Sequence, residues 1–370
     1  MQKSDWSGRT AALGQSIPLS LQHLFAMFGA TVLVPILFKI NPATVLLMNG
    51  IGTLLYIWIC KGKIPAYLGS SFAFLSPVFI VLSSKGYSAA LGGFIASGIV
   101  FTVVGLLVKA VGTRWIDVVF PPAAMGAIIA VIGLELAPTA AGMAGFIAPP
   151  GAGPNWSVNV PAVAVSVITL LTAIIGSVMF RGFLKIIPIL ISIIVGYIAA
   201  YAAGIVDLSG VGNASVIGLP TFYTPVLDWS SILIILPASL VVIAEHIGHL
   251  LVTENIVGRN LSKDPGLDRS LIGNGISTIV SGFAGSTPNT TYGENIGVLA
   301  LTRVYSVWVI GGAAVIAIVL SFCGKLAALI QSIPAPVMVE CLCCCSASSR
   351  VRAFGFWSNP RSITRSPKKI

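Results

Sequence analysis

Long apolar runs separated by short polar turns make up most of the chain. A helix needs about 20 apolar residues to cross ~30 Å of hydrocarbon, and most of these runs approach that length. The runs that begin at Tyr67, Leu271 and Tyr292 are shorter. The pattern predicts an all-α integral membrane protein with about eleven to twelve spans. The predicted spans are Ile17–Phe38, Ala43–Cys60, Tyr67–Leu82, Ala89–Val111, Pro121–Glu135, Val160–Phe180, Leu184–Ile205, Ser231–Leu251, Leu271–Phe283, Tyr292–Leu301, Val304–Cys323 and a last one from Leu326 onward.

The composition points to a lipid environment. Hydrophobic residues fill 56% of the 370 positions and charged residues only 9%, with a mean hydropathy of +0.97. Soluble chains carry about 25% charged residues, so this chain cannot cover itself with a polar surface. The lipid bilayer is therefore its predicted partner.

Lysine and arginine fix the orientation, because cytoplasmic loops carry an excess of them. The N-terminal segment and the loops after even-numbered spans hold twelve basic residues, and the loops after odd-numbered spans hold three. The N-terminus is thus predicted to be cytoplasmic. The net charge of +10 follows from this sorting and from a basic tail, so no nucleic-acid partner is predicted. Met1–Ser16 is polar, and no cleavable signal peptide is visible.

Two carboxylates fall where a membrane protein avoids charge. Glu245 lies deep in a predicted span, and Glu294 follows the polar segment Asn289–Gly293. A carboxylate at membrane depth costs at least ~2.5–3.5 kcal/mol, so it marks a functional site by default. The alternative is an interhelical hydrogen bond that only specifies packing.

His249 lies four residues after Glu245, so both side chains share one helical face. A carboxylate and an imidazole together favour proton handling, with simple packing of His249 as the alternative. His246 points about 100° away from Glu245. The order of these residues does not fit the zinc-protease motif, which needs His, Glu, two spacers and His. An intramembrane metalloprotease is therefore disfavoured, and neither a metal nor a cofactor is predicted.

Two predicted spans begin with segments that disfavour a helix. Pro65–Phe74 and Gly285–Asn295 are rich in Gly, Ser, Thr and Pro. They fall at the third and tenth spans, so the two halves enter the membrane from opposite sides and form an inverted repeat. Broken helices at matching places are the best sequence indication of a transporter's midplane site.

Two facing extended segments offer free N–H and C=O groups, and the two carboxylates add acceptors. This inventory suits a flat neutral ligand such as a pyrimidinedione and repels an anion. Aromatic side chains from the broken segments are candidates to wall the site, with ordinary packing as the alternative for each. They are Tyr67, Phe72, Phe74 and Tyr292.

The segments Gln22–Pro35, Ala244–His249 and Ser286–Gly297 resemble the nucleobase–ascorbate transporter family. The likeness runs from about Ser16 to Met338. It implies an inverted seven-plus-seven repeat, with two short strands before half-helices three and ten, and a transporter in the bacterial cytoplasmic membrane that imports uracil with protons.

The resemblance also implies roles for individual residues. Glu245 and Glu294 would bind the nucleobase, and His249 would position it and, with Glu245, couple the proton. Phe72 and Gly293 would present backbone amides from the two short strands, and Tyr292 would also bind the substrate. Purine-transporting relatives tend to carry Gln in place of Glu294, so uracil is favoured over xanthine or urate.

The same resemblance divides the chain into a core domain and a gate domain. The predicted divisions are a cytoplasmic N-terminus over 1–16, core over 17–111, gate over 112–230, core again over 231–323, the start of gate span twelve over 324–338, and a tail over 339–370. Affinity, proton stoichiometry and homodimer formation stay open.

The tail changes character after Met338. Four of the six cysteines lie between Cys341 and Cys345, and six of the 21 basic residues follow Glu340. A basic cytoplasmic tail and a cysteine-rich metal site are two interpretations. A one-base shift in reading frame turns Cys343–Cys345 into two leucines followed by Leu or Phe and restores a plausible membrane helix, so we expect an out-of-frame tail. An inactive truncated product is then the alternative to an active transporter.

Overall fold

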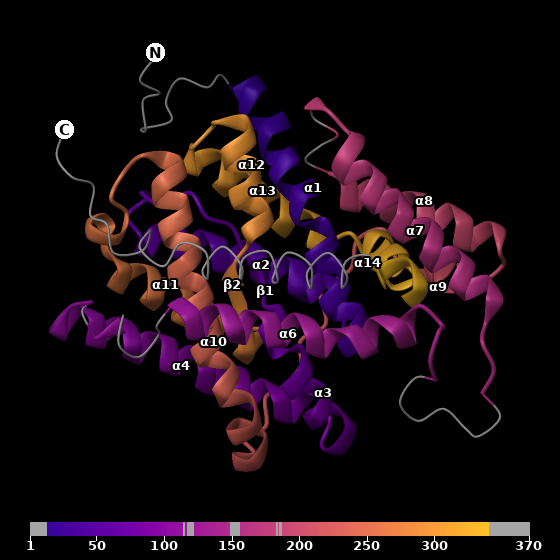
Figure 1. Ribbon diagram of the computed structural model, residues 1–370, viewed down its shortest axis with the longest axis horizontal. Coiled ribbons are helices and arrows are strands. Elements are labelled where there is room, and N and C mark those ends of the chain that lie inside the picture. Colours follow the sequence, from indigo (N-terminus) through magenta and orange to yellow (C-terminus); the bar gives the residue numbers. More distant parts are fainter. Residues whose placement is uncertain are drawn as a thin grey trace.

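The computed structural model describes residues 13–113, 115–116, 122–148, 156–182, 184 and 187–339. Helices dominate these ranges, and two three-residue strands lie near their centre (Figure 1). The all-α class with two short strands is therefore confirmed. The predicted tail lies almost wholly outside the described residues.

The helices follow the predicted runs closely. In the first half they are α1 Leu13–Phe38, α2 Pro42–Ile59, η1 Phe72–Phe74, α3 Leu75–Ser84, α4 Tyr87–Val111, α6 Pro122–Met143, α7 Val160–Met179, α8 Pro188–Ala202 and α9 Ser209–Asn213. In the second half they are α10 Trp229–Val257, η3 Ser262–Gly266, α11 Leu267–Ala284, α12 Gly293–Thr302, α13 Val307–Ser321, α14 Gly324–Gln331 and η4 Ala335–Met338. The strands are β1 Leu68–Ser70 and β2 Asn289–Thr291.

Five described helices have the length and apolar composition to cross a membrane. They are Ser16–Phe38, Pro42–Ile59, Tyr87–Val111, Val160–Met179 and Trp229–Val257. The helices α3 and α12 are only 10 residues long each. The strand β1 takes the first part of the predicted span Tyr67–Leu82, whereas β2 lies just before the predicted span Tyr292–Leu301. The total number of spans stays a prediction.

Two close helix pairs each join one helix of the first half to one helix of the second half. The helix α4 packs along α11, and α13 packs along α2. A Cβ atom placed on Gly275 would lie 2.7 Å from the carbonyl oxygen of Gly98, and one on Gly50 would lie 2.7 Å from that of Ala314. Gly50 and Gly275 follow Asn49 and Asn274 in equivalent positions of the inverted repeat. Glycine at both places lets the paired backbones touch.

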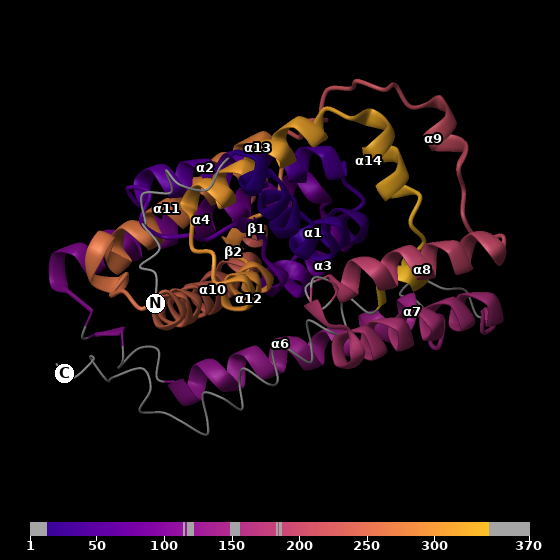
Figure 2. The same ribbon diagram turned by 90° about the horizontal axis from the view of Figure 1, so that it is seen from above.

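A second group of helices lies beside this bundle. The helices α7 and α8 pack on each other, and α6 runs along the edge of the bundle (Figure 2). A Cβ atom on Gly196 of α8 would lie 2.2 Å from the Thr169 hydroxyl of α7, so this pair is also tightly packed. The resemblance assigned these three helices to the gate.

Two ion pairs join loops of the first half to loops of the second. Lys63 contacts Asp264 at 2.6 Å, and Lys85 contacts Asp228 at 2.7 Å. Asp228 also caps α10 by accepting a hydrogen bond from the Ser231 amide. Lys85 and Ser231 hold the pKa of the Asp228 carboxyl well below its usual range. The resulting stabilisation is present at neutral pH and is lost as the pH falls through that lowered pKa.

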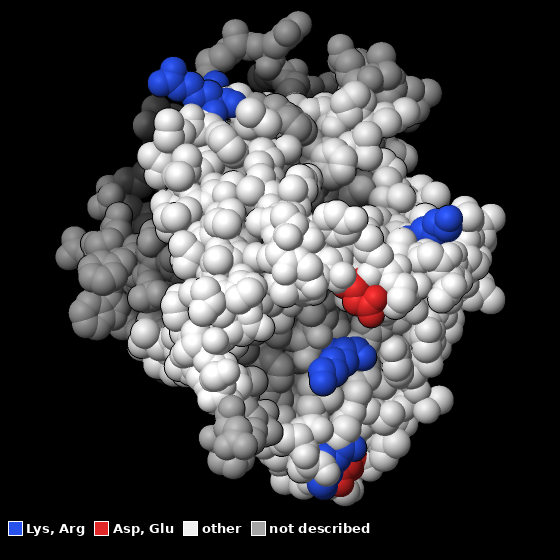
Figure 3. All heavy atoms as spheres, turned by 90° about the vertical axis from the view of Figure 1, so that its right-hand side faces the viewer, with Lys and Arg blue, Asp and Glu red and all other residues white. Residues whose placement is uncertain are grey.

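Charge is sparse elsewhere on the visible surface. On the face drawn in Figure 3, uncharged residues make up nearly all of the described surface, and charged residues appear only at isolated places. Large apolar side chains such as Trp58, Val178, Trp229 and Trp308 are more than two-thirds exposed. Such a surface matches a hydrocarbon environment.

The glycine contacts generate a stability prediction. We expect Gly275→Ala to lower the melting temperature of the detergent-solubilised protein, because overpacking a close helix contact costs about 1–3 kcal/mol. Gly311→Ala is the matched control, since its added Cβ would meet side-chain atoms no nearer than 3.9 Å. We expect that control to be neutral or stabilising, because alanine favours a helix. Equal melting temperatures for both variants would contradict the proposed close packing.

Candidate functional site

The two strands cross at the centre of the core. They pair antiparallel, with Leu68 opposite Thr291 and Ser70 opposite Asn289. The pairing extends beyond the strands, because the Tyr292 amide donates to the Tyr67 carbonyl at 3.0 Å. Each strand thus satisfies the polar backbone of the other, which non-helical backbone at membrane depth requires.

A threonine from a neighbouring helix holds each strand at its first residue. The Leu68 amide donates to the Thr53 hydroxyl at 2.9 Å, and that hydroxyl lies 3.4 Å from the Leu68 carbonyl. The Thr278 hydroxyl makes the same two contacts with Asn289, both at 3.2 Å. Thr53 and Thr278 are thus equivalent clamps, one from α2 and one from α11.

These clamps were not predicted, although the sequence carries a signal for them. Asn49-Gly50-Ile51-Gly52-Thr53 and Asn274-Gly275-Ile276-Ser277-Thr278 are nearly the same five residues, one in each half. The two segments differ at one position, where Gly52 corresponds to Ser277. Glycine is needed at position 52 because a Cβ atom there would lie 2.2 Å from the Ser277 hydroxyl. The Asn289 amide group donates to that same hydroxyl at 2.6 Å.

Each strand leads into the N-terminus of a helix. Phe72 is the first residue of η1 and Gly293 is the first residue of α12. The first N–H groups of a helix have no partner within it, and they carry partial positive charge. Tyr292 precedes α12, is 3% exposed and lays its ring over Gly69, where a Cβ atom would lie 2.2 Å from the ring. The predicted amide donors therefore lie at two helix starts beside the strand crossing.

The predicted titratable residues lie around this crossing. The His249 Nε2 atom lies 4.0 Å from the Glu245 carboxylate, and the two side chains are 9% and 25% exposed. The His249 Nδ1 atom is hydrogen-bonded to the Thr291 hydroxyl at 3.0 Å. Glu294 is half-buried in the first turn of α12. The helix α10 that carries Glu245 and His249 packs against η1, β2 and α12.

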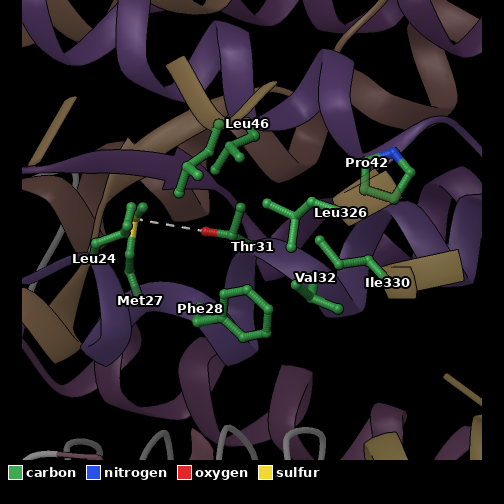
Figure 4. A pocket seen from close by; sticks show the side chains of 10 residues that line it. Leu24, Met27, Phe28, Thr31, Val32, Pro42, Leu46, Leu326 and Ile330 are labelled. Carbon is green, nitrogen blue, oxygen red and sulfur yellow. Dashed lines mark hydrogen bonds between the residues drawn. The ribbon is translucent and has the colours of Figure 1, made fainter. Parts of the chain in front are cut away.

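An apolar pocket lies next to the site but differs from it in chemistry. Its lining comes from α1, α2, α13 and α14, and Thr31 is its polar exception, donating to the Met27 sulfur at 3.7 Å (Figure 4). Leu24, Met27 and Leu46 of this pocket pack in one cluster with Tyr67 and Tyr292. The pocket supports the aromatic wall of the site and offers few hydrogen bonds to a polar ligand.

Metal binding gains no support within the described residues, where no cluster of three or more His, Cys, Asp or Glu side chains has metal-binding geometry. The cysteines of the predicted tail lie outside them.

Comparison with known proteins defines the class. A profile of the Permease family matches residues 14–345, so the chain belongs to that family. The transmembrane domain of the cyanobacterial bicarbonate transporter BicA has the same fold, with a TM-score of 0.70 over 96% of this chain and 95% of that one, at 14% identity. The inverted-repeat fold class expected from the sequence is thereby confirmed, and the protein is a multi-pass membrane transporter by family and fold.

The curated relatives are more specific. The chain is 74% identical to the uracil permease of Paenibacillus larvae over 324 residues, which are 88% of this chain and 77% of that protein. It is 66% identical to the uracil permease of Escherichia coli K12, over 88% of this chain and 74% of that one. The family resemblance seen in the sequence is confirmed. The roles of Glu245, Glu294, His249, Phe72 and Gly293 stay predictions.

The threonine clamps generate a second prediction. Thr278→Val keeps the shape of the side chain and leaves the buried Asn289 amide and carbonyl without this partner, at a cost of about 1–3 kcal/mol. We expect a lower melting temperature for this variant and recovery in Thr278→Ser, which keeps the hydroxyl. Thr172→Val on α7 is the control, because its exposed hydroxyl bonds only the Ile168 carbonyl of its own helix. A clamp variant as stable as that control would refute the clamp.

Proposed function

We propose that this protein imports uracil across the cytoplasmic membrane together with protons. The observation that carries the proposal is the strand crossing, where two helix N-termini and the side chains of Glu245, His249 and Glu294 meet on packed elements. The high identity to uracil permeases supports the substrate.

The site suits a neutral nucleobase because it supplies both kinds of hydrogen-bonding group. Carboxylates accept hydrogen bonds from ring N–H groups, and Glu245 and Glu294 are the acceptors we assign to them. The amides of Phe72 and Gly293 are the donors we assign to the ring carbonyls. The Tyr292 ring covers the apolar face of the base. A ligand that lacks one of the matching groups leaves a protein partner unpaired and binds more weakly, so the site discriminates against such ligands.

Proton coupling is assigned to Glu245 and His249. Imidazole titrates near neutral pH, and a nearby carboxylate stabilises its charged form. His249 also contacts Thr291, the last residue of β2. Protonation of the ring therefore changes a hydrogen bond to the strand that leads to Glu294. A change of charge on His249 thus acts on Glu245 directly and on Glu294 through the Thr291 contact and the backbone that follows it.

Transport requires the site to open to each side in turn. We assign residues 17–111 and 231–323 to a core that carries the site, and residues 112–230 together with 324–338 to a gate. In such folds one bundle moves against the other around a fixed site. The strand crossing belongs entirely to the assigned core, so the site moves as one body. The N-terminus is assigned to the cytoplasm from the basic residues of the loops.

The first test concerns the substrate acceptor. Glu294→Gln replaces an acceptor oxygen with a donor, and we expect the affinity for radiolabelled uracil to fall by about tenfold or more, since an unpaired buried N–H costs ~1–3 kcal/mol. Asp207→Asn is the matched control, because that carboxylate is exposed and its hydrogen bonds go to the nearby Ser209. Xanthine should compete poorly with uracil in the parent. Unchanged uracil affinity in Glu294→Gln would remove Glu294 from the site.

The second test concerns coupling. We expect His249→Leu to impair uptake driven by an imposed pH gradient more than it impairs equilibrium uracil binding, because leucine cannot carry the proton. Uptake into proteoliposomes with and without the gradient measures this difference. If the gradient accelerates His249→Leu as strongly as the parent, His249 is a packing residue.

A further inference from the structure

A second histidine is completely buried beside the proposed site and has no part in substrate binding. We propose that His246, Ser270 and Tyr56 form the path by which the coupled proton leaves the site toward the cytoplasmic side. This inference rests on the proton coupling proposed above.

The three side chains form a continuous hydrogen-bonded chain. The His246 Nε2 atom lies 2.7 Å from the Ser270 hydroxyl, and that hydroxyl lies 2.7 Å from the Tyr56 hydroxyl. His246 and Ser270 are 0% exposed and Tyr56 is 1% exposed. Each side chain comes from a different helix, namely α10, α11 and α2. The hydrogen-bonded path therefore joins both halves of the assigned core. Packing alone seldom places three polar groups together in a dry interior, because each must be desolvated.

The chain begins next to the proton-coupling residue. His246 and His249 are three residues apart on α10, so their side chains are neighbours on the helix surface. Both line one narrow cleft with Tyr56, Ile64, Ala66 and Thr291. The cleft has no room for a water-sized sphere, so transfer between the rings requires the cleft to widen during the transport cycle. Thr291, which bonds His249, thus marks the site end of the path.

The free nitrogen of His246 faces no partner. Its Nδ1 atom is buried without a hydrogen bond, whereas unpaired buried polar atoms are rare and cost about 1–3 kcal/mol. When the ring proton is on Nε2 and is donated to Ser270, Nδ1 is a bare acceptor. Because His246 and His249 line the same cleft, we assign this bare nitrogen as the atom that receives the proton.

The groups around this path set its direction. Cys60 lies one helical turn beyond Tyr56 on α2, and on α10 the titratable neighbours are Glu245 and His249. On α11, Asp268 and Arg269 precede Ser270, and Arg269 donates to the Ile59 carbonyl at 3.4 Å. The path therefore leads from Glu245 and His249 toward the end of α2, which Lys61 and Lys63 follow, and the start of α11, which carries Arg269. This is the side assigned to the cytoplasm.

The transfer conserves protons at every step. Protonated His249 gives its proton to His246 Nδ1, and His246 passes its Nε2 proton to the Ser270 oxygen. Ser270 passes its own hydroxyl proton to Tyr56. Because Tyr56 is buried here, it releases a proton to water only when the transport cycle opens the neighbouring ends of α2 and α11 to the cytoplasmic side. Reorientation of the two hydroxyl groups and of the imidazole tautomer restores the starting state.

The test separates proton release from substrate handling. His246→Gln keeps a side-chain donor for Ser270 and cannot titrate. We expect it to lower gradient-driven uracil uptake by about tenfold or more, the scale on which a positioned proton-transfer group contributes. Equilibrium uracil binding and uracil counterflow, which need no net proton release, should stay within about twofold of the parent, and the pH optimum of uptake should shift.

Tyr56→Phe is the second variant, because it keeps the ring and removes only the hydroxyl. It should show the same selective loss. Ser97→Ala is the control, since Ser97 is equally buried and bonds only the Gly93 carbonyl of its own helix. Gradient-driven uptake at the parental level in either variant overturns the inference, and so does a loss of binding that matches the loss of uptake. If the parent itself shows no gradient response, the proposed coupling fails; if the parent responds and the variants respond equally, only the proton path fails.

Discussion

Polar backbone inside a hydrocarbon layer must find its partners within the protein, and this constraint shapes the core. Two segments leave the helical form, and each pairs with the other because no water is there to satisfy them. The clamps from Thr53 and Thr278 fix the ends of the strands, and Gly50 and Gly275 let the supporting helices approach. The strands can then end where two helices begin, and each helix start carries amide groups that its own helix does not use.

The same arrangement explains why carboxylates are tolerated at this depth. The first turn of a helix carries partial positive charge, which favours an acidic side chain there. Glu294 occupies that turn in α12, and Glu245 has His249 at its side. In the proposed function, a neutral ligand with N–H groups would donate hydrogen bonds to both carboxylates without adding charge. The proposed function thus assigns substrate choice and proton coupling to one polar cluster.

Much of the fold could be predicted from the sequence, because apolar runs and positions of Lys and Arg are read directly from it. The broken third and tenth spans were predicted for the same reason: Gly, Ser, Thr and Pro disfavour a helix locally. The span starting at Tyr67 nevertheless differs in detail, since the helix α3 begins only at Leu75. The boundary depends on pairing with Asn289–Thr291, which lies more than two hundred residues away and leaves no local pattern.

The same limit applies to the contact of His249 with Thr291 and to the buried His246, whose partners come from α11 and α2. Helical spacing placed Glu245 beside His249, but no spacing rule could join residues of different helices.

The central claim is that the substrate lies at the strand crossing, between Glu245 and Glu294. Crystals of the protein with 5-bromouracil would test it most directly, because the bromine gives an anomalous signal that locates the base. The account predicts a single strong peak between α10 and the start of α12, beside the Tyr292 ring. A peak in the apolar pocket lined by Leu24 and Leu326, with none at the crossing, would contradict it.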